Sequence, residues 1–448
     1  MTEQQNEWAS RFGFIMVATG AAVGLGNIWK FPYMAGQNGG GLFLALYLAF
    51  LFLIGVPAMI AEMALGKLGR KNIIDSLRQI RDDYSLSFPW HWVGYLGVLA
   101  LILILGFYSA IAGWSIAYFF KTLSGQVIDT TSDTILSHWD SFLANPKALL
   151  TWHTVYMFIT LWVVVNGVNK GIEKLSNWAM PLLFLLLGFL VTYACTYGDL
   201  ASAKAFLLDF KLEALTPNVL ISAMGQALFS LAVGAGAMLV YGAYVPARMP
   251  LGSNLIIVAT LNGFVAILAG FAIFPLVFNY GLSPAAGPDL MFKVLPLTFN
   301  EMVGGQFIGV LFFLLLFIAA LTSSISQAEP LVMMLSEKWG LHRATSALIV
   351  GLMSWGVGVA SLLSFNVWSD VHLLGDMNLF DSFAEIATDI ILPIGAFAFC
   401  FLAAWRIPKS AIQEAILISD KAFALWRVLV GILVPLTLFW IYIVKLTD

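Results

Sequence analysis

Eleven long apolar stretches run through this chain, and they constrain its fold more than any other feature. About eighteen mostly apolar residues are enough to cross a bilayer as a helix. Helices are expected because backbone N–H and C=O groups in lipid need partners within the same segment, and no stretch alternates polar and apolar residues as barrel strands do. The predicted spans lie near residues 12–36, 41–65, 92–120, 149–168, 176–198, 217–246, 253–281, 306–335, 344–364, 385–405 and 424–446.

The composition agrees with a chain whose partner is the lipid bilayer. Residues of the AVILMFWYC set make up 60% of the sequence and charged residues only 10%, too little charge for the surface of a soluble protein of this length. The net charge is -3 without blocks of like charge, so no nucleic-acid partner is expected. No linker or soluble module interrupts the spans, and residues 1–448 are predicted to form a single transmembrane domain.

The distribution of Lys and Arg predicts the orientation, because cytoplasmic loops carry an excess of these residues. With the N-terminus in the cytoplasm, the inside set is Arg11, Lys67, Arg70, Lys71, Arg78, Arg81, Lys170, Lys174, Arg248, Lys338, Arg343, Arg406, Lys409, Lys421 and Arg427. The smaller outside set is Lys121, Lys147, Lys204, Lys211, Lys293 and Lys445, and Lys30 falls inside the first span. We therefore expect a multi-pass protein of the inner (plasma) membrane with its N-terminus inside and its C-terminus outside.

Two of the predicted spans, the first and the sixth, carry glycine clusters in their interiors. Glycine costs roughly 1 kcal/mol relative to Ala inside a helix, so such clusters mark places where a helix can unwind or pack closely. The clusters are Gly20, Gly24 and Gly26 in the first span and Gly225, Gly234 and Gly236 in the sixth. Both lie near mid-membrane, and the two spans run in opposite directions, which predicts an inverted-repeat transporter with discontinuous helices. Close packing of small residues is the alternative.

Neutral oxygen donors accompany the two glycine clusters. Asn27, Ser230 and Asn262 lie near the clusters, and the eighth span places Ala319, Thr322, Ser323 and Ser326 on one helical face. Such donors suit Na⁺, because tight Ca²⁺ and Mg²⁺ sites usually bring carboxylates. No Asp or Glu stands beside either cluster, so an anionic substrate group is expected to complete the charge balance. Ordinary hydrogen bonding between helices is the competing explanation for the hydroxyls.

The motifs resemble one known family. Residues 6–43, NEWASRFGFIMVATGAAVGLGNIWKFPYMAGQNGGGLF, closely resemble the first-helix signature of the neurotransmitter:sodium symporter family, which has the LeuT-type fold. Supporting matches are Glu62 in GVPAMIAEMALG, Tyr108 in GFYSAIAGW, Asn262 in ATLNG, the sixth span from Gly225 to Tyr244 and AALTSSIS at 319–326. The resemblance covers spans one to ten and implies an all-α 5+5 inverted repeat with discontinuous helices 1 and 6.

The resemblance also implies boundaries for the repeats. The first repeat would cover about 11–198, the second about 217–405, and an additional eleventh helix about 424–446. A twelfth helix is absent, as in an eleven-helix bacterial branch of the family that includes a multi-hydrophobic amino acid transporter.

By this resemblance the protein would bind two Na⁺ ions. One site would use the Ala22 carbonyl, Asn27, Ser230, Asn262 and the substrate carboxylate. The second would use the carbonyls of Gly20, Val23 and Ala319 with the hydroxyls of Thr322 and Ser323. Both sets contain only neutral protein oxygens.

The substrate implied by the resemblance is an L-amino acid. Its carboxylate would lie on the amides of Leu25 and Gly26 and the hydroxyl of Tyr108, and Phe229 would close over it. The remaining substrate contacts would come from Ile104, Phe229, Ala232, Ala235, Ser323 and Gln327. Ala235 replaces an aromatic residue of the leucine-transporting relative, so we expect a roomier site and several hydrophobic substrates, aromatic ones included. Ordinary core packing is the alternative for the apolar members.

The resemblance further implies gates on both sides of the site. The gate candidates are Trp8, Lys30, Gly171, Pro181, Tyr244, Glu337, Asp381 and Glu385. Gln5 stands where the family has a cytoplasmic gate arginine, so that ion pair with Glu337 cannot form. Gly171 and Pro181 match a Gly-X9-Pro motif that would unwind to release sodium, although an ordinary proline kink would fit too.

A further site concerns an anion or a proton. Tyr47, Gln226 and Ser230 occupy positions of the family's chloride site, but Ala266 stands where chloride-dependent members have Ser and others Glu, which leaves chloride use open. Glu62, a carboxylate within a span, is a candidate for proton exchange during the return step.

Three classes of function remain at this point. Sodium-coupled symport is the main hypothesis, and no G-x-x-x-x-G-K-[ST] loop suggests direct use of ATP. An ion channel or amino-acid-gated pore of the same fold would reveal itself by currents far above substrate flux. An intramembrane enzyme is disfavoured because the sequence has no H-E-x-x-H or G-x-S-x-G motif. The oligomeric state stays open.

Overall fold

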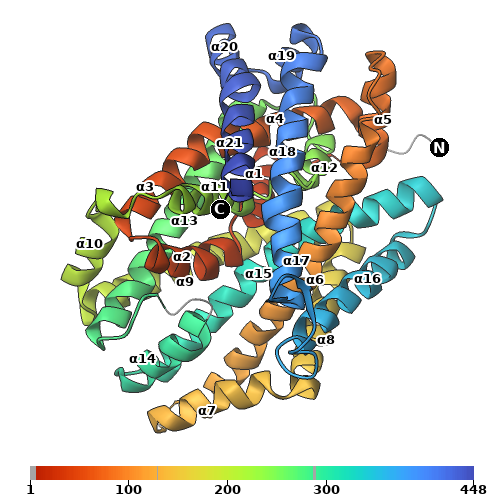
Figure 1. Ribbon diagram of the computed structural model, residues 1–448. Helices are drawn as coiled ribbons and strands as arrows, with labels where there is room; N and C mark the ends of the chain where they lie inside the picture. Colours follow the sequence, from red (N-terminus) through yellow and green to blue (C-terminus); the bar gives the residue numbers. More distant parts are fainter. Residues whose placement is uncertain (1–6, 129, 286–288, 448) are drawn as a thin grey trace.

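The computed structural model describes residues 7–128, 130–285 and 289–447, and Figure 1 shows a bundle of long, tilted helices. Nine helices in these ranges are long and apolar enough to cross a membrane. They are Gly41–Gly69, His91–Leu123, Pro146–Val165, Val168–Tyr197, Leu251–Asn279, Gly305–Trp339, Arg343–Leu363, Leu379–Arg406 and Asp420–Ile441. A tenth span consists of Arg11–Ala22 and Gly26–Gln37, which are bent by 47° at their junction.

The predicted sixth span is also a broken helix. It is formed by α11 (Pro217–Ser230) and α12 (Ala237–Ala243), with residues 231–236 between them. All eleven predicted stretches therefore fold as helices, and the two with glycine clusters are the two that break. The fifth helix starts at Val168, earlier than the predicted residue 176, because the π-helical turn η3 (Val168–Glu173) leads into α9.

The spans are assembled from the following elements. The first half has α1 (Arg11–Ala22), η1 (Gly26–Lys30), α2 (Phe31–Gln37), α3 (Gly41–Phe50), η2 (Leu51–Gly55), α4 (Val56–Gly69), α6 (His91–Leu123), α8 (Pro146–Val165) and α9 (Lys174–Tyr197). After α11 and α12 come α13 (Leu251–Asn279), α15 (Gly305–Trp339), α16 (Arg343–Leu363), α17 (Leu379–Ala384), η6 (Glu385–Ile391), α18 (Leu392–Phe401), η7 (Leu402–Arg406), α20 (Asp420–Val428), η8 (Leu429–Leu433) and α21 (Val434–Thr447).

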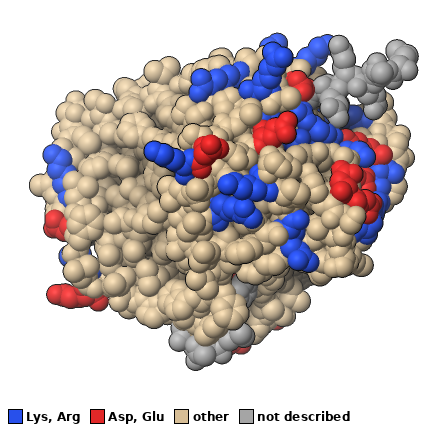
Figure 2. Space-filling view, turned by 90° about the horizontal axis from the view of Figure 1, so that it is seen from above, with Lys and Arg blue, Asp and Glu red and all other residues tan. Residues whose placement is uncertain are grey.

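Shorter elements connect the spans. They are α5 (Ile73–Asp83), α7 (Ser132–Leu143), α10 (Leu200–Leu208), η4 (Leu212–Ala214), η5 (Leu290–Val294), α14 (Leu295–Glu301), the strands β1 (His372–Leu374) and β2 (Met377–Asn378), and α19 (Lys409–Ile416). Figure 1 places α5, α19 and α20 at one end of the bundle and α7 and α14 at the other. Figure 2 looks onto the first of these ends and shows Lys and Arg side chains gathered there.

Packing separates a dense interior from an apolar outer surface. Helices α6 and α15 pack along each other, and α1 packs against α9, α13 and α15, so the broken first span lies inside the bundle. On the outside, large apolar side chains such as Phe158, Trp162 and Leu185 are exposed. Water would disfavour such a surface, whereas acyl chains match it.

Glycines allow α4 and α12 to approach until their backbones touch. A Cβ atom on Gly66 would overlap the carbonyl oxygen of Leu239, and one on Gly242 would overlap the carbonyl oxygen of Met63. Since both obstacles are backbone atoms, no side-chain rotation can relieve the overlap. This contact fixes the half-helix α12 against the continuous helix α4.

The variant Gly242→Ala is expected to lower the thermal unfolding midpoint in detergent, because the added methyl group must push α12 away from α4. Gly188→Ala is the matched control, since nothing lies within 4 Å of a Cβ atom placed there. Equal midpoints for both variants and the parent would contradict a tight contact at Gly242.

Candidate functional site

A cavity lies at the centre of the bundle, between the breaks of the first and sixth spans. The breaks fall at residues 23–25 and 231–236. The lining residues include the predicted substrate contacts Gly26, Ile104, Tyr108, Phe229, Ala232, Ala235, Ser323 and Gln327. Other lining residues are Ala21, Ala22, Gly24, Leu101, Ser230, Ala237, Ser326 and Leu392. The structure therefore brings residues from five spans, far apart in the sequence, around one space.

The second break is held by a carboxylate. Glu62 of α4 is fully buried and accepts hydrogen bonds from the backbone N–H groups of Gly234 at 2.7 Å, Met238 at 3.0 Å and Leu239 at 3.3 Å. The positive φ angles of Gly234 (101°) and Gly236 (85°) fit glycine, which has no Cβ to clash. The sequence-based statement that no Asp or Glu stands beside the breaks is wrong for the folded protein, because α4 carries Glu62 there.

The first break lies against Tyr108, Ser323 and Phe229. The Leu25 N–H donates to the hydroxyl of Tyr108 at 2.9 Å, and a Cβ on Gly24 would collide with Ser323 and Tyr108. A Cβ on Gly26 would lie 3.2 Å from the ring of Phe229. Of the groups predicted to hold and cover a substrate carboxylate, Gly26, Tyr108 and Phe229 thus line the cavity, and Leu25 lies behind the Tyr108 hydroxyl to which it donates.

The residues predicted for the first sodium site form a buried polar cluster. The Asn27 side-chain amide donates to the backbone carbonyl and to Oδ1 of Asn262, both at 2.9 Å. The Asn262 amide donates to the hydroxyls of Tyr47 at 3.0 Å and Ser230 at 3.2 Å. Oδ1 of Asn27 is buried, and no described residue hydrogen-bonds to it. A buried amide oxygen without a donor is suited to a cation.

The residues predicted for the second sodium site also converge, between α1 and α15. The Ser323 hydroxyl donates to the Gly20 carbonyl at 3.1 Å, and the Thr322 hydroxyl donates to the Ala319 carbonyl at 3.1 Å. A Cβ on Gly20 would lie 3.1 Å from Cβ of Thr322, so the two helices are in close contact here. Val23 follows directly at the end of α1, in an extended conformation.

The predicted anion or proton site is only partly polar. The Gln226 amide donates to the Gly26 carbonyl at 2.6 Å, and Tyr47 lies 3.3 Å from the Ser230 hydroxyl. Ala266 is buried and supplies no polar side chain. Tyr47 and Gln226 therefore contact the first break and the polar cluster, whereas Glu62 belongs to the second break.

On the side of the cavity toward α5, the start of the first span is sealed against α12. The Trp8 indole N–H donates to the Tyr241 carbonyl at 3.1 Å, and its backbone N–H donates to the Tyr244 carbonyl at 3.0 Å. The Tyr244 hydroxyl in turn donates to the buried carboxylate of Glu329 at 2.9 Å, and Arg343 pairs with the same carboxylate. The sequence analysis singled out Trp8 and Tyr244 but missed Glu329 and the role of Arg343.

A second missed carboxylate holds the same end of α1. Glu173 of η3 is buried and accepts from the Ala9 backbone N–H at 3.0 Å, and its carboxylate lies beside Gly13. Gly171 and Pro181 lie within η3 and α9, which are helical throughout, so the unwinding expected between them is not a feature of this conformation.

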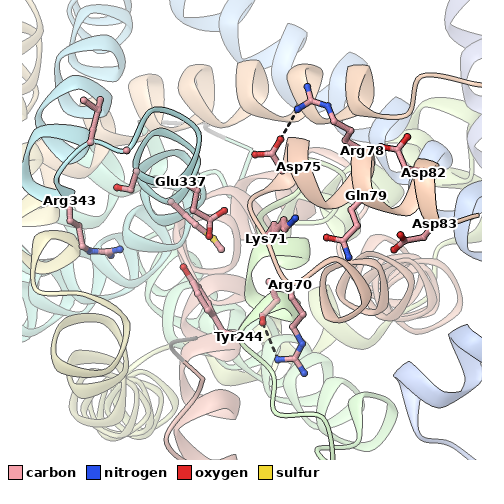
Figure 3. Close-up of a pocket in the computed structure, with 15 residues that line it drawn as sticks. Arg70, Lys71, Asp75, Arg78, Gln79, Asp82, Asp83, Tyr244, Glu337 and Arg343 are labelled. Carbon is pink, nitrogen blue, oxygen red and sulfur yellow. Dashed lines mark hydrogen bonds and ion pairs between the residues drawn. The ribbon is translucent and has the colours of Figure 1, made fainter. Parts of the chain in front are cut away.

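A large polar cavity of about 1230 Å³ opens at the end of the bundle that carries α5. Figure 3 shows α5 side chains, among them Asp75 and Arg78, along one wall and Glu337 and Arg343 on the opposite side. Glu337 accepts from the backbone and side-chain N–H groups of Asn72 at 2.8 and 2.9 Å, so it caps the start of α5. Gln5, the departure noted at the gate, lies outside the described residues.

At the opposite side of the central cavity, Lys30 lies over the Phe229 ring, with Nζ 4.6 Å from the ring centroid. Of the acidic gate candidates from the tenth span, Asp381 accepts from the Asn378 side chain at 2.8 Å, and Glu385 begins η6. Asp389, which the sequence analysis did not consider, lies against α11, 3.5 Å from a Cβ placed on Gly225. No simple motif marks it, because its position depends on how η6 packs against α11.

The fold and the central site define a polytopic membrane transporter built around two discontinuous helices. Residues 5–139 and 136–448 match the model of the sodium:neurotransmitter symporter family, and the chain belongs to this family. It is therefore a sodium-dependent transporter and not an enzyme, as the sequence predicted.

Similar proteins extend over the full length of the chain. The uncharacterized sodium-dependent transporter YhdH of Bacillus subtilis is 35% identical over 448 residues, which cover 99% of this chain and 98% of YhdH. An uncharacterized sodium-dependent transporter of Haemophilus influenzae is 30% identical over 453 residues, covering 99% of each. The crystal structure of MhsT in complex with L-phenylalanine matches with a TM-score of 0.92 at 37% identity, over 98% of this chain and 99% of MhsT. The predicted LeuT-type fold is confirmed.

The buried pair of Glu329 and Arg343 yields a stability prediction. Arg343→Met leaves a buried carboxylate unpaired and is expected to reduce the free energy of unfolding by about 3–5 kcal/mol. Adding Glu329→Gln should restore most of the loss, because a neutral amide can still accept from Tyr244. Denaturant unfolding in detergent measures both effects.

The control for this experiment is Arg81→Ala, which breaks the more exposed pair with Asp82 and should change the unfolding free energy far less. If the double variant is as unstable as Arg343→Met, the unpaired charge is not the cause of the loss.

Proposed function

We propose that the protein carries hydrophobic L-amino acids, aliphatic and aromatic, into the cell together with Na⁺ by alternating access. The observation that carries this proposal is the central cavity, which is polar at one end and apolar at the other. The Tyr108 hydroxyl, which accepts from the Leu25 N–H and can donate its own proton, suits a carboxylate, whereas Ile104, Ala235 and Leu392 suit an apolar side chain. The similarity to MhsT, solved with L-phenylalanine, supports an aromatic amino acid as one substrate.

Two sodium ions are proposed as co-substrates. The first would be held by Asn27, Ser230, Asn262 and the Ala22 carbonyl, and it would contact the substrate carboxylate. The unpartnered Oδ1 of Asn27 supports this assignment. The second would lie where Gly20, Val23, Ala319, Thr322 and Ser323 meet. Their hydroxyls now donate to carbonyls of α1 and α15, and binding would turn hydroxyl oxygens toward the ion.

The proposed direction of transport rests on the charge distribution. The end of the bundle that carries α5 holds Arg70, Lys71, Arg78 and Arg81 and shows the gathered Lys and Arg of Figure 2. By the positive-inside rule this end is cytoplasmic, so the N-terminus is inside, and eleven spans place the C-terminus outside. Inward movement of Na⁺ releases about 2.3 kcal/mol per charge for each 100 mV, which can drive accumulation.

The gates follow from this orientation. Trp8, Tyr244 and Glu337 would form the cytoplasmic side, and Gly171 and Pro181 would open the release path for sodium. Lys30 and Phe229 would cover the external side, together with an acid of the tenth span, for which Asp381, Glu385 and Asp389 are candidates.

Sodium coupling can be tested in proteoliposomes with labelled leucine, tyrosine and tryptophan. Uptake should require an inward Na⁺ gradient, and Asn27→Ala should abolish it because the unpartnered oxygen is lost. The control variant is Asn38→Ala, because Asn38 belongs to neither proposed sodium site. Amino-acid uptake by this variant should stay sodium-dependent. Equal uptake when K⁺ replaces Na⁺ would refute sodium symport, and currents far above substrate flux would favour a channel.

The shape of the apolar end of the central cavity can be tested with the variant Ala235→Phe. The larger ring should fill space beside Ile104 and narrow uptake toward small substrates, with tryptophan lost first. Competition of unlabelled amino acids against leucine uptake measures the effect. Unchanged competition by tryptophan would place its side chain away from Ala235.

A further inference from the structure

One polar atom in the central cavity, Oε1 of Gln327, has no hydrogen-bond partner among the described residues. Five polar side chains line the cavity: Tyr108, Ser230, Ser323, Ser326 and Gln327. The first four all hydrogen-bond to described residues. Gln327 is 8% exposed, and its Oε1 is buried without any hydrogen-bond partner among the described residues. A buried amide oxygen of this kind is costly, and most such groups in proteins are paired.

The described surroundings of Gln327 offer no donor to its Oε1. Ser326, the adjacent hydroxyl, already accepts from the Tyr241 hydroxyl at 2.8 Å and donates to the Thr322 carbonyl at 2.9 Å. Apart from the five polar side chains, only apolar residues and glycines line the cavity, Leu101, Ile104 and Leu392 among them. A molecule bound in the cavity can supply the missing donor.

The position of Gln327 identifies which part of a substrate would reach it. Ser323 lies beside Gly24 and Tyr108, at the end proposed for the substrate carboxylate. Gln327 follows Ser323 by four residues on α15, so it lies on the same helical face about 6 Å further along the axis. An aromatic side chain anchored at Tyr108 spans a comparable length. Its ring edge would meet the Gln327 amide.

We propose that Gln327 is a specificity-determining residue that hydrogen-bonds to a polar atom on the ring of an aromatic substrate. This inference rests on the proposed function and names the preferred substrates within it, tyrosine and tryptophan over phenylalanine. The glutamine amide offers both an acceptor and a donor. It can therefore accept from the indole N–H of tryptophan and either accept from or donate to the hydroxyl of tyrosine.

The discrimination works through the unpaired amide. Phenylalanine fills the same apolar space but leaves Oε1 without a donor, whereas tyrosine and tryptophan supply one. A site with a buried polar group discriminates strongly against an analogue that lacks the matching group. An apolar wall discriminates less strongly between substrates that differ only in size. Gln327 would thus add selectivity among aromatic substrates to a pocket that is otherwise permissive.

The test removes the Gln327 amide and the ring hydroxyl of the substrate, separately and together, and compares the effects on binding. Inhibition constants of tyrosine and phenylalanine against sodium-driven leucine uptake are measured in proteoliposomes for the parent and for Gln327→Leu. The preference for tyrosine over phenylalanine should fall about ten-fold in the variant, the size of one hydrogen bond in a buried site. Gln306→Leu, the same substitution on α15 but outside the cavity lining, should leave the preference unchanged.

A substrate pair tests the inference without any variant. Tyrosine and 4-methylphenylalanine have nearly the same shape, and only tyrosine can hydrogen-bond through its ring substituent. In the parent protein tyrosine should inhibit leucine uptake at the lower concentration, because an unpaired hydroxyl would otherwise weaken its binding. Weaker inhibition by tyrosine would overturn the inference, even if Gln327→Leu failed to fold.

The outcomes separate this inference from the proposed function. Sodium-dependent uptake with an unchanged tyrosine preference in Gln327→Leu would refute the role of Gln327 alone. Absence of sodium-dependent uptake for every amino acid in the parent would refute the proposed function, and the substrate assignment of Gln327 with it.

Discussion

A helix that stops inside a membrane exposes amide groups that lipid cannot satisfy, and the rest of this structure depends on how that constraint is met. At the second break the buried carboxylate of Glu62 accepts three backbone N–H groups. It is carried by α4, the helix whose glycines let it touch α12. The broken span is therefore ordered and held beside a continuous helix, and the central cavity lies between this break and the first one.

The cavity joins two chemical environments that together suit an amphipathic solute. Amides, hydroxyls and asparagine side chains gather around the first break, whereas aliphatic side chains line the space beyond it. On the side toward α5, Trp8 and Tyr244 seal the start of α1 against α12, and the pair of Glu329 and Arg343 ties this seal to α15 and α16. The conformation is closed on this side of the cavity by contacts among four separate helices.

Much of the site could be predicted from local patterns. The glycine clusters marked both breaks, and the spacing of Thr322 and Ser323 placed two hydroxyls on one face, where the structure puts them against Gly20. Glu329, Glu173 and the capping role of Glu62 escaped prediction. Their partners lie 14 to 177 residues away in the chain, and no local pattern records such a pairing.

The sequence by itself determined the number of helices, their membrane character and the two places where helices break, because apolar length and glycine content act locally along the chain. Only the tertiary structure decided which polar groups are satisfied. Asn27 and Gln327 look alike in the sequence as amides in apolar surroundings. Folding pairs the amide nitrogen of Asn27 with Asn262, whereas among the described residues neither Oδ1 of Asn27 nor Oε1 of Gln327 finds a donor, since hydrogen bonding depends on distance between helices and not on their order.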